Sequence, residues 1–354
     1  MRLHVFNPEH DLALAADLRN FTPPHAARDL RSDLSFLPAI WAEEGDMVLV
    51  ADKVFAQRAY GRLKARLTLM GIKSGKKVEF VEKDMLSSII VDRIIPWGWD
   101  KALKTSFLRM GVMEETLPKD EEIEKLRNLS ERAASPKLRG KLLSLKGTVG
   151  KAFKCDDTGK ITKLSAKYGN LVAKAPWSGS GRGIRFLGKE ISSQEWKWMD
   201  NIIRRQGSIM IEPQYDKVRD LGMEFMANKD GKASYLGLSL FSTNKGAYSG
   251  SLLATENEKR SIVERYINGD LIDEITEIIC REKWDYDGPF GVDMMIVRGN
   301  DGEGFLLHPC VEINMRRTMG HVALNISPKE EGRPYLMNIE YGSPCRIRIL
   351  KTNL

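Results

Sequence analysis

The sequence has few cysteines and histidines, and neither type is spaced as a metal-binding or redox motif. The four cysteines, Cys155, Cys280, Cys310 and Cys345, are far apart, and no Cys-x-x-Cys pair occurs. The five histidines add no spacing typical of zinc sites. We therefore expect four reduced thiols in or near the core, and neither a structural zinc site nor a disulfide framework.

Long apolar runs are also missing. No stretch approaches the roughly 18 apolar residues that a membrane-spanning helix needs. The N-terminus turns polar at Asn7 and then carries Glu9, His10 and Asp11, so it lacks the apolar core of a secretory signal. These features predict a cytoplasmic protein that does not engage a membrane.

Positive charge is in excess and unevenly placed. The chain of 354 residues has a formal net charge of +7. Between Lys137 and Lys174 there are ten Lys or Arg residues, and the only acids there are Asp156 and Asp157. Such a field suits a polyanion, either a nucleic acid or a nucleotide triphosphate, although a solvated surface is the ordinary alternative. Aromatic residues are sparse in this stretch, which argues against nucleic acid.

The first third of the chain alternates strand and helix patterns. Apolar runs predict strands, and residues 54–70 carry apolar side chains at helical spacing, with Gly71 as a C-cap. The predicted strands are 3–6, 46–50 and 77–81. This alternation predicts a parallel α/β sheet, and we assign residues 1–115 to an N-terminal domain. The segment Pro96-Trp97-Gly98-Trp99 interrupts the pattern, and a hinge, an interface and core packing are all open for it.

The remainder mixes short strands with helices and reads as α+β. Residues 120–134 form a charged amphipathic helix, and 256–282 a second helical run with a break at Asn268-Gly269. The predicted strands are 171–174, 184–187, 208–211, 223–226, 234–241, 290–297 and 305–313. We divide this part into residues 116–205 and residues 206–354.

A glycine-rich segment between two predicted strands is the densest motif. Lys174 precedes it, and it contains Ser178, Gly179, Ser180, Gly181, Arg182 and Gly183. Glycine allows backbone N–H groups to face an anion without obstruction, and the serines add donors. A strand rather than a helix follows, so neither a Walker loop nor a dinucleotide fingerprint fits. The segment predicts a flap over phosphates, and a plain flexible hairpin is the alternative.

Three oxygen-bearing side chains interrupt two apolar strands near the C-terminus. Asp293 lies in one strand, and Glu312 and Asn314 lie two apart in the other, so the latter two share a face. Oxygen ligands of this kind suit Mg²⁺ that also binds substrate phosphates. Arg316 and Arg317 follow at once, and cations beside carboxylates suit phosphoryl transfer.

Taken together, these motifs resemble the ATP-grasp superfamily, over roughly residues 120–325. Ser135-Pro136-Lys137 to Leu143 is similar to the segment that carries the first nucleotide-binding lysine in D-alanine–D-alanine ligases. Lys174 and the segment from Ser178 to Gly183 resemble the second lysine and the glycine flap. The resemblance implies an N-terminal α/β domain of the kind that precedes ATP-grasp domains, followed by a two-subdomain ATP-grasp fold.

The resemblance also implies roles for single residues. Glu212, Gln214 and Tyr215 match the adenine hinge, and Glu224 matches the ribose-binding acid. The residues in the metal positions are Asp293, Glu312 and Asn314. Arg316 is similar to the arginine that biotin carboxylase-like members aim at the reacting group. Gly291 stands where D-alanine ligases carry an arginine, so this sequence departs from those enzymes.

The activity implied by the resemblance is that of an ADP-forming ligase with ATP and Mg²⁺. A small carboxylate would be activated as an acyl phosphate and then attacked by an amine or a similar nucleophile. A kinase that stops at a phosphorylated product and a non-catalytic nucleotide- or nucleic-acid-binding protein are the alternatives. The sequence leaves the carboxylate and the nucleophile open, and it leaves a homodimer open.

The loop after the first predicted strand is a candidate for the acceptor site. Ligands of parallel α/β sheets bind beyond the carboxyl ends of the strands, and residues 7–11 form a polar loop there. We consider His10 as the catalytic group that accepts the amine proton, with Asp11 orienting it, against a plain helix-capping turn. A polar segment at residues 243–251 is a second candidate, as a loop that closes over substrate.

Overall fold

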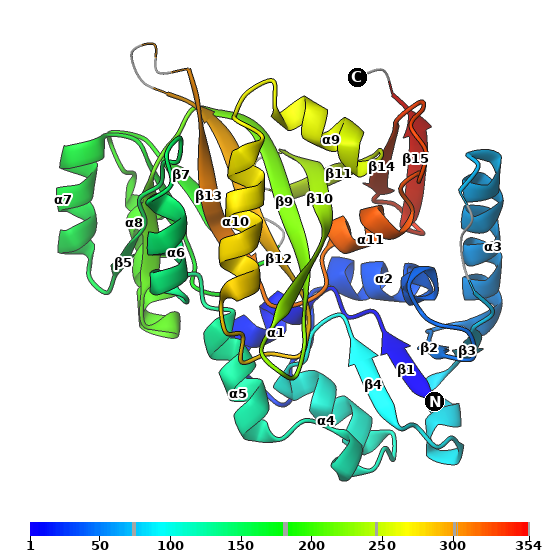
Figure 1. Cartoon of the computed structure of the whole chain (residues 1–354). Coiled ribbons are helices and arrows are strands. Elements are labelled where there is room, and N and C mark those ends of the chain that lie inside the picture. Colours follow the sequence, from blue (N-terminus) through cyan, green and yellow to red (C-terminus); the bar gives the residue numbers. More distant parts are fainter. Residues whose placement is uncertain (73–75, 180–182, 245–246, 300–301, 303, 353–354) are drawn as a thin grey trace.

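A computed structural model describes residues 1–72, 76–179, 183–244, 247–299, 302 and 304–352. These residues form three sheets with helices packed around them (Figure 1). The sheets follow one another along the chain, within residues 2–96, 153–213 and 217–351. None of the helices in the described ranges combines the length and the apolar character needed to cross a bilayer.

The first sheet is parallel, as the alternating pattern predicts, and its strand order is β3-β2-β1-β4. Asp52 and Asp100 cap two of the helices, because each side chain accepts a hydrogen bond from a first-turn backbone N–H. The elements are β1 (Arg2–Val5), α1 (His10–Ala16), α2 (His25–Asp33), η1 (Leu37–Ile40), β2 (Met47–Leu49), α3 (Lys53–Leu69), β3 (Glu79–Val81), η2 (Lys83–Ser88), β4 (Arg93–Pro96), α4 (Lys101–Arg109) and η3 (Glu114–Thr116).

The second sheet is small and has the order β5-β8-β6-β7. Its apolar face and two helices enclose a separate core that includes Ile161, Leu171, Met199 and Ile211. The elements are β5 (Phe153–Cys155), α7 (Thr158–Tyr168), β6 (Leu171–Lys174), β7 (Ile184–Leu187), α8 (Ser193–Gln206) and β8 (Ile209–Pro213). Because β8 pairs with β5 and β6, this sheet extends to Pro213, beyond the boundary predicted at residue 205.

The third sheet is antiparallel, with the order β13-β12-β9-β10-β11-β14-β15. The prediction of a loop at residues 243–251 is wrong, because most of these residues belong to the paired strands β10 and β11. Lys245 and Gly246 lie outside the described residues. The strands are β9 (Lys217–Ala227), β10 (Ala233–Asn244), β11 (Ala247–Leu253), β12 (Gly288–Arg298), β13 (Phe305–Asn314), β14 (Tyr335–Glu340) and β15 (Arg346–Lys351).

Five helices belong with the third sheet: α5 (Asp120–Leu129), α6 (Pro136–Leu143), α9 (Glu256–Val263), α10 (Asp270–Arg281) and α11 (Met319–Asn325). Leu126, Leu138 and Leu142 are buried in its large core, so α5 and α6 pack there and not on the second sheet, where the predicted division placed them. α6 lies beside β13.

A shared apolar core joins the first sheet to the third. Phe6 and Trp97 follow β1 and β4, and they are buried together with Val322 and Met337 of the C-terminal part. The ring of Trp97 meets Phe6 edge-on at a centroid distance of 5.1 Å. Pro96–Trp99 is thus a core-packing segment, and the carboxyl ends of β1 and β4 lie beside the third sheet.

Gly98 tests this packing. A Cβ on Gly98 would lie 2.6 Å from ring atoms of His10, which is 0% exposed and has no room to move aside. We predict that Gly98→Ala lowers the free energy of unfolding by about 1–3 kcal/mol, measured by urea denaturation. Gly61 in α3 is the matched control, because nothing lies within 4 Å of its Cβ position. Gly61→Ala should raise stability by roughly 0.5–1 kcal/mol, and an unaffected Gly98→Ala variant would contradict the packing.

Candidate active site

Three carboxylates lie on one face of the third sheet, on three adjacent strands. Asp293 of β12 stands directly opposite Glu312 of β13, and Glu224 of β9 stands opposite Gly291 of β12. Residues two apart share a face, so Glu224, Asp293 and Glu312 project from the same side. Like charges placed this way repel one another, so the fold must compensate them or leave a place for a cation.

Asp293 is the carboxyl that feels this repulsion most. Burial, followed by the carboxylates of Glu312 and Glu224, raises the pKa of Asp293 to about 8. The side-chain amide of Asn314 donates to Asp293 Oδ2 over 2.9 Å and partly offsets the effect. Asp293, Glu312 and Asn314 are therefore brought together, as the alternation along the two strands predicts.

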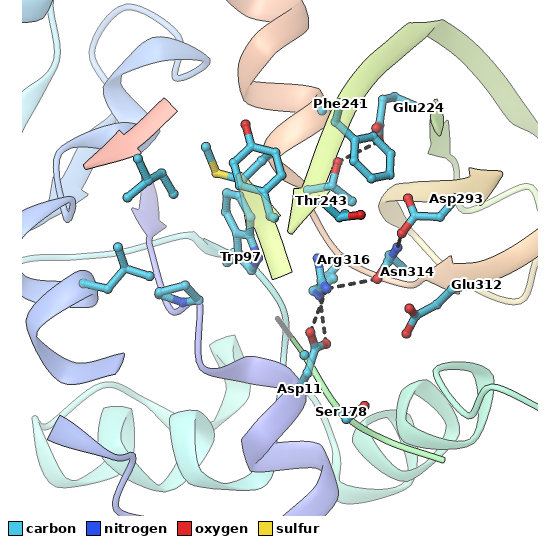
Figure 2. A pocket seen from close by; sticks show the side chains of 18 of the residues that line it. Asp11, Trp97, Ser178, Glu224, Phe241, Thr243, Asp293, Glu312, Asn314 and Arg316 are labelled. Atoms are coloured by element: carbon cyan, nitrogen blue, oxygen red, sulfur yellow. Dashed lines mark hydrogen bonds and ion pairs between the residues drawn. The ribbon is translucent and has the colours of Figure 1, made fainter. Parts of the chain in front are cut away.

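Arg316 links these residues to the N-terminal part of the chain. Its Nε and Nη2 donate to the two oxygens of Asp11 over 2.8 and 2.7 Å, and Nη2 also donates to Asn314 Oδ1 over 2.9 Å (Figure 2). Burial opposes the ionisation of Asp11, but the ion pair with Arg316 outweighs it and lowers the pKa of Asp11. Arg316 thus displays the fork geometry that binds a carboxylate at two points.

Arg132 is the site residue that the sequence analysis missed. It lies just after α5, is 6% exposed, and its Nη1 is 2.9 Å from Glu312 Oε2. Its other nitrogens donate to the carbonyls of Ala175 and Ser178 and to the Ser178 hydroxyl. Arg132 therefore ties the predicted metal ligand Glu312 to the first residues of the glycine-rich segment. No local sequence pattern singles it out.

A cavity of about 570 Å³ lies between the second and third sheets, and we call it the inter-sheet cavity. Lys174 and Glu212 form a buried ion pair on its second-sheet side, with Nζ 2.5 Å from Oε2. Alternation along β6 explains this, because Val172 and Lys174 face the cavity while Leu171 and Ala173 face the core. Gln214 and Tyr215 also line this cavity, so the predicted hinge residues are assembled with Lys174.

A second cavity of about 190 Å³ lies between the N-terminal part and the third sheet, and we call it the N-terminal cavity. Ser178, Gly179, Glu224, Asn314 and Arg316 are among its lining residues. Six residues line both cavities: Arg132, Ile184, Phe241, Thr243, Asp293 and Glu312. The two spaces therefore meet at the paired carboxylates.

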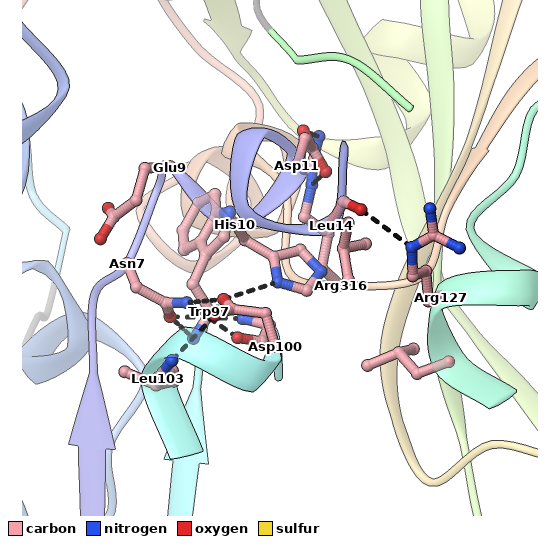
Figure 3. A network of polar contacts seen from close by, with 12 residues as sticks. Asn7, Glu9, His10, Asp11, Leu14, Trp97, Asp100, Leu103, Arg127 and Arg316 are labelled. Atoms are coloured by element: carbon pink, nitrogen blue, oxygen red, sulfur yellow. Dashed lines mark hydrogen bonds and ion pairs between the residues drawn. The ribbon is translucent and has the colours of Figure 1, made fainter. Parts of the chain in front are cut away.

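The loop at residues 7–11 is held by buried polar contacts, shown in Figure 3. Asn7 donates to the carbonyl of Gly98 over 2.8 Å, and His10 Nδ1 lies 3.4 Å from Asp100 Oδ2. His10 is completely buried and is not among the residues that line either cavity. Its placement does not support the predicted role as proton acceptor, and Asp11 faces Arg316 rather than orienting His10.

Two further residues lie away from their predicted places. Lys137 is exposed on α6 and outside both cavity linings, because Leu138 and Leu142 turn the opposite face of the helix into the core. Arg139 of the same helix donates to the Arg132 carbonyl instead. Glu224 lines the N-terminal cavity and not the inter-sheet cavity, so its placement does not support ribose binding.

The glycine-rich segment is described only in part. Ser180, Gly181 and Arg182 lie outside the described residues. Ser178 and Gly179 line the N-terminal cavity, and a Cβ on Gly179 would lie 2.6 Å from Asp11 Oδ2. Gly183 is packed against Ser178, where a Cβ would meet Oγ at 2.3 Å, and its carbonyl accepts from the Ala175 N–H. The described ends of the segment therefore approach the carboxylates, and glycine is needed at both contacts.

The donor set fits a hard divalent cation. Asp293 and Glu312 offer carboxylate oxygens, while the amide nitrogen of Asn314 faces Asp293 and its Oδ1 accepts from Arg316. Within the described ranges, no three His, Cys, Asp or Glu side chains form a self-sufficient metal site. Two carboxylates are what Mg²⁺ takes from a protein when phosphates and water complete its shell. The raised pKa of Asp293 shows that this position favours a nearby positive charge.

Comparisons with known proteins identify the fold. No protein-family model matches the chain, and no curated protein matches it in sequence. The biotin carboxylase of Campylobacter jejuni, solved as a β,γ-ATP complex, matches with a TM-score of 0.50 and 12% identity, over 96% of this chain and 75% of that one. The ADP complex of N5-carboxyaminoimidazole synthetase from Staphylococcus aureus gives 0.48 and 10%, over 96% and 82%. The MgADP complex of the biotin carboxylase domain of 2-oxoglutarate carboxylase from Hydrogenobacter thermophilus gives 0.49 and 14%, over 84% and 75%.

The match to biotin carboxylase confirms the ATP-grasp fold that the sequence motifs predict. An N-terminal parallel α/β unit precedes two sheets that enclose the inter-sheet cavity. At such low identity the likeness concerns the fold, and the chemistry of this chain has to be argued from its own residues.

The repulsion at Asp293 has a measurable consequence. Its folded-state pKa of about 8 lies above the ordinary value of 3.8, so the folded protein binds the extra proton between these values. This group's contribution to stability is therefore fully present below pH 3.8 and is lost progressively as pH rises to about 8. We predict that, without metal, the stability gained by Asp293→Asn over the wild type in urea is larger at pH 9 than at pH 5, by roughly a few kcal/mol. An equal effect at both pH values would contradict the assignment.

Proposed function

We propose that this protein binds Mg-ATP in the inter-sheet cavity and uses it to activate a small carboxylate for attack by an amine, releasing ADP and phosphate. The observation that carries the proposal is the meeting of two cavities at Asp293 and Glu312. One cavity is large enough for a nucleotide, and the other opens toward the N-terminal part. Phosphates bound at the junction would face a substrate in the second cavity.

The inter-sheet cavity has the features that a nucleotide needs. Val172, Met294 and Val311 supply apolar walls for a base, and Glu212, Gln214 and Tyr215 lie at one end. Lys174 is held by Glu212 and places a positive charge toward the phosphates. Ser178 and Gly179, at the start of the glycine-rich segment, line the N-terminal cavity together with Asp293 and Glu312, and backbone N–H groups of such a segment favour anions.

Asp293, Glu312 and Asn314 would hold the magnesium ion. When bound, the ion would neutralise charge on the phosphates and lower the barrier to their transfer. The protein's own residues do the positioning: Asn314 orients Asp293, and Arg132 orients Glu312 while it anchors Ser178. Arg132 thus connects Ser178, at the start of the glycine-rich segment, to Glu312.

Arg316 would bind the substrate carboxylate, in the two-point geometry that Asp11 shows in this structure. A carboxylate oxygen attacks the γ-phosphorus and ADP leaves, which gives an acyl phosphate. The amine, once its ammonium form has given a proton to water, attacks the acyl carbon, the carbon–oxygen bond to phosphate breaks, and the remaining extra proton on nitrogen passes to the departing phosphate. Catalysis of this kind depends on alignment and on fixed charges rather than on covalent participation by the protein.

The nucleotide site is tested by thermal denaturation with ATP, with and without Mg²⁺. At about 100 times its dissociation constant, a ligand stabilises the folded state by roughly 2.7 kcal/mol. We predict a magnesium-dependent rise in melting temperature for the wild type and its loss in Lys174→Ala. In Asp293→Asn and Glu312→Gln the dependence on magnesium should disappear, and ADP formation with it.

Lys163→Ala is the matched control, because Lys163 is an exposed lysine of α7 in the same basic stretch. It should keep the wild-type response. A wild-type protein that shows no shift with Mg-ATP, or a Lys174→Ala variant that keeps the full shift, would overturn the proposal.

A further inference from the structure

We propose that the N-terminal cavity recognises a primary ammonium group borne on a branched or aromatic apolar body, with Glu224 as the residue that binds the ammonium. This inference rests on the proposed function, since it names the class of amine that such a ligase would use. It follows from the division of the cavity into a polar end and an apolar end, and from the state of the Glu224 carboxylate.

Glu224 is a buried carboxylate, and one of its two oxygens already accepts a hydrogen bond. It is 2% exposed, and its Oε2 accepts from the Thr318 hydroxyl over 2.8 Å and lies 2.9 Å from His321 Nδ1. No described residue donates a hydrogen bond to Oε1. Because Glu224 lines the N-terminal cavity, a ligand bound there could donate a charge-assisted hydrogen bond to Oε1.

Glycines keep space around this carboxylate. A Cβ on Gly320 would lie 1.8 Å from Glu224 Oε1, and a Cβ on Gly291 would lie 2.7 Å from Oε2. A Cβ on Gly222 would lie 3.4 Å from Glu224 Oε1 and 3.5 Å from Asp293 Oδ1. The glycines therefore let Glu224 lie against the cavity floor, close to Asp293 and the junction where the acyl group would form.

The opposite end of the cavity is apolar. Phe6, Leu30 and Trp97 come from the N-terminal part, and Met319 and Ile339 from the C-terminal part. In Figure 2, Trp97 lies across the pocket from Asp293 and Glu312. A bound amine would thus extend its apolar body toward Trp97 while its ammonium stays at Glu224.

The space favours a bulky side chain. The N-terminal cavity is continued by a side cavity of about 250 Å³, which shares Pro8, Leu30 and Tyr248 with it. Leu12, Ala26 and Ala27 add apolar wall, and the carboxylates of Glu9 and Asp11, which also line it, are each paired with an arginine. Burial of apolar groups there contributes roughly 0.8 kcal/mol per CH₂ in transfer free energy. A small amine would leave this apolar surface uncovered. An amine with an acidic side chain would place a further carboxylate near Glu224.

The inference is tested by calorimetric titration of L-leucine and L-phenylalanine into the protein saturated with Mg²⁺ and a non-hydrolysable ATP analogue. The matched ligands are 2-hydroxy-4-methylpentanoate, which has leucine's shape without the ammonium, and L-alanine, which keeps the ammonium without the bulk. We expect leucine or phenylalanine to bind at least ~10-fold more tightly than either matched ligand. Equal dissociation constants for leucine and 2-hydroxy-4-methylpentanoate would overturn the inference.

Two variants separate the ends of the cavity. Glu224→Gln keeps the shape of the side chain but removes its charge, so it should abolish the preference for leucine over the hydroxy acid. The control is Glu121→Gln, at an exposed position of α5, which should preserve the preference. Ile339→Ala removes side-chain atoms from the apolar wall, so leucine should bind about 10-fold more weakly and alanine unchanged. Retention of the full preference in Glu224→Gln would contradict the role of Glu224, and unchanged leucine binding in Ile339→Ala would contradict the placement of the side chain.

The titration also distinguishes the two proposals. The heat of binding of the ATP analogue is measured first and reports on the nucleotide site alone. If the analogue binds and neither apolar amino acid does, the inference fails while the proposed function stands. If the analogue does not bind, the proposed function fails and the inference falls with it.

Discussion

The concentration of negative charge on the third sheet is the constraint on which the rest of the site depends. Glu224, Asp293 and Glu312 project from one face of three adjacent strands, and burial together with the neighbouring carboxylates raises the pKa of Asp293. Each carboxylate meets its own compensating group: Asn314 for Asp293, Arg132 for Glu312, and the Thr318 hydroxyl for Glu224. Arg132 also donates to the carbonyls of Ala175 and Ser178, so it links Glu312 of the third sheet to the segment that follows β6. A bound cation would complete that balance, which links nucleotide binding to the stability of the fold.

Local patterns were sufficient for much of the architecture. Alternating apolar residues predicted β6 and β7 at the bounds observed, and they placed Glu312 and Asn314 on one face of β13. The parallel first sheet also followed from the alternation of strands and helices. Side-chain direction along a strand is fixed by a period of two residues, so a short sequence determines which side chains share a face.

Long-range geometry was beyond the sequence. Arg132 lies between α5 and α6 and reaches Glu312, 180 residues later, because α6 packs beside β13; no local pattern encodes that approach. Lys137 was predicted to face the nucleotide, but the burial of its neighbours on α6 rotates it outward. His10 carried the residue type of a general base, yet the contact with Gly98 and Asp100 encloses it. Glu224 was predicted to bind the ribose. Only the pairing of β9 with β12 reveals that it lies beside Asp293.

The central claim is that a divalent cation and the phosphates of a nucleotide meet at the junction of the two cavities. The most direct test is a crystal structure of the protein with Mn²⁺ and a non-hydrolysable ATP analogue, in which anomalous scattering locates the metal. The account predicts an anomalous peak within coordination distance of Asp293 and Glu312, with the nucleotide base beside Glu212 and Gln214. A peak at other residues, or a nucleotide bound outside the inter-sheet cavity, would contradict it.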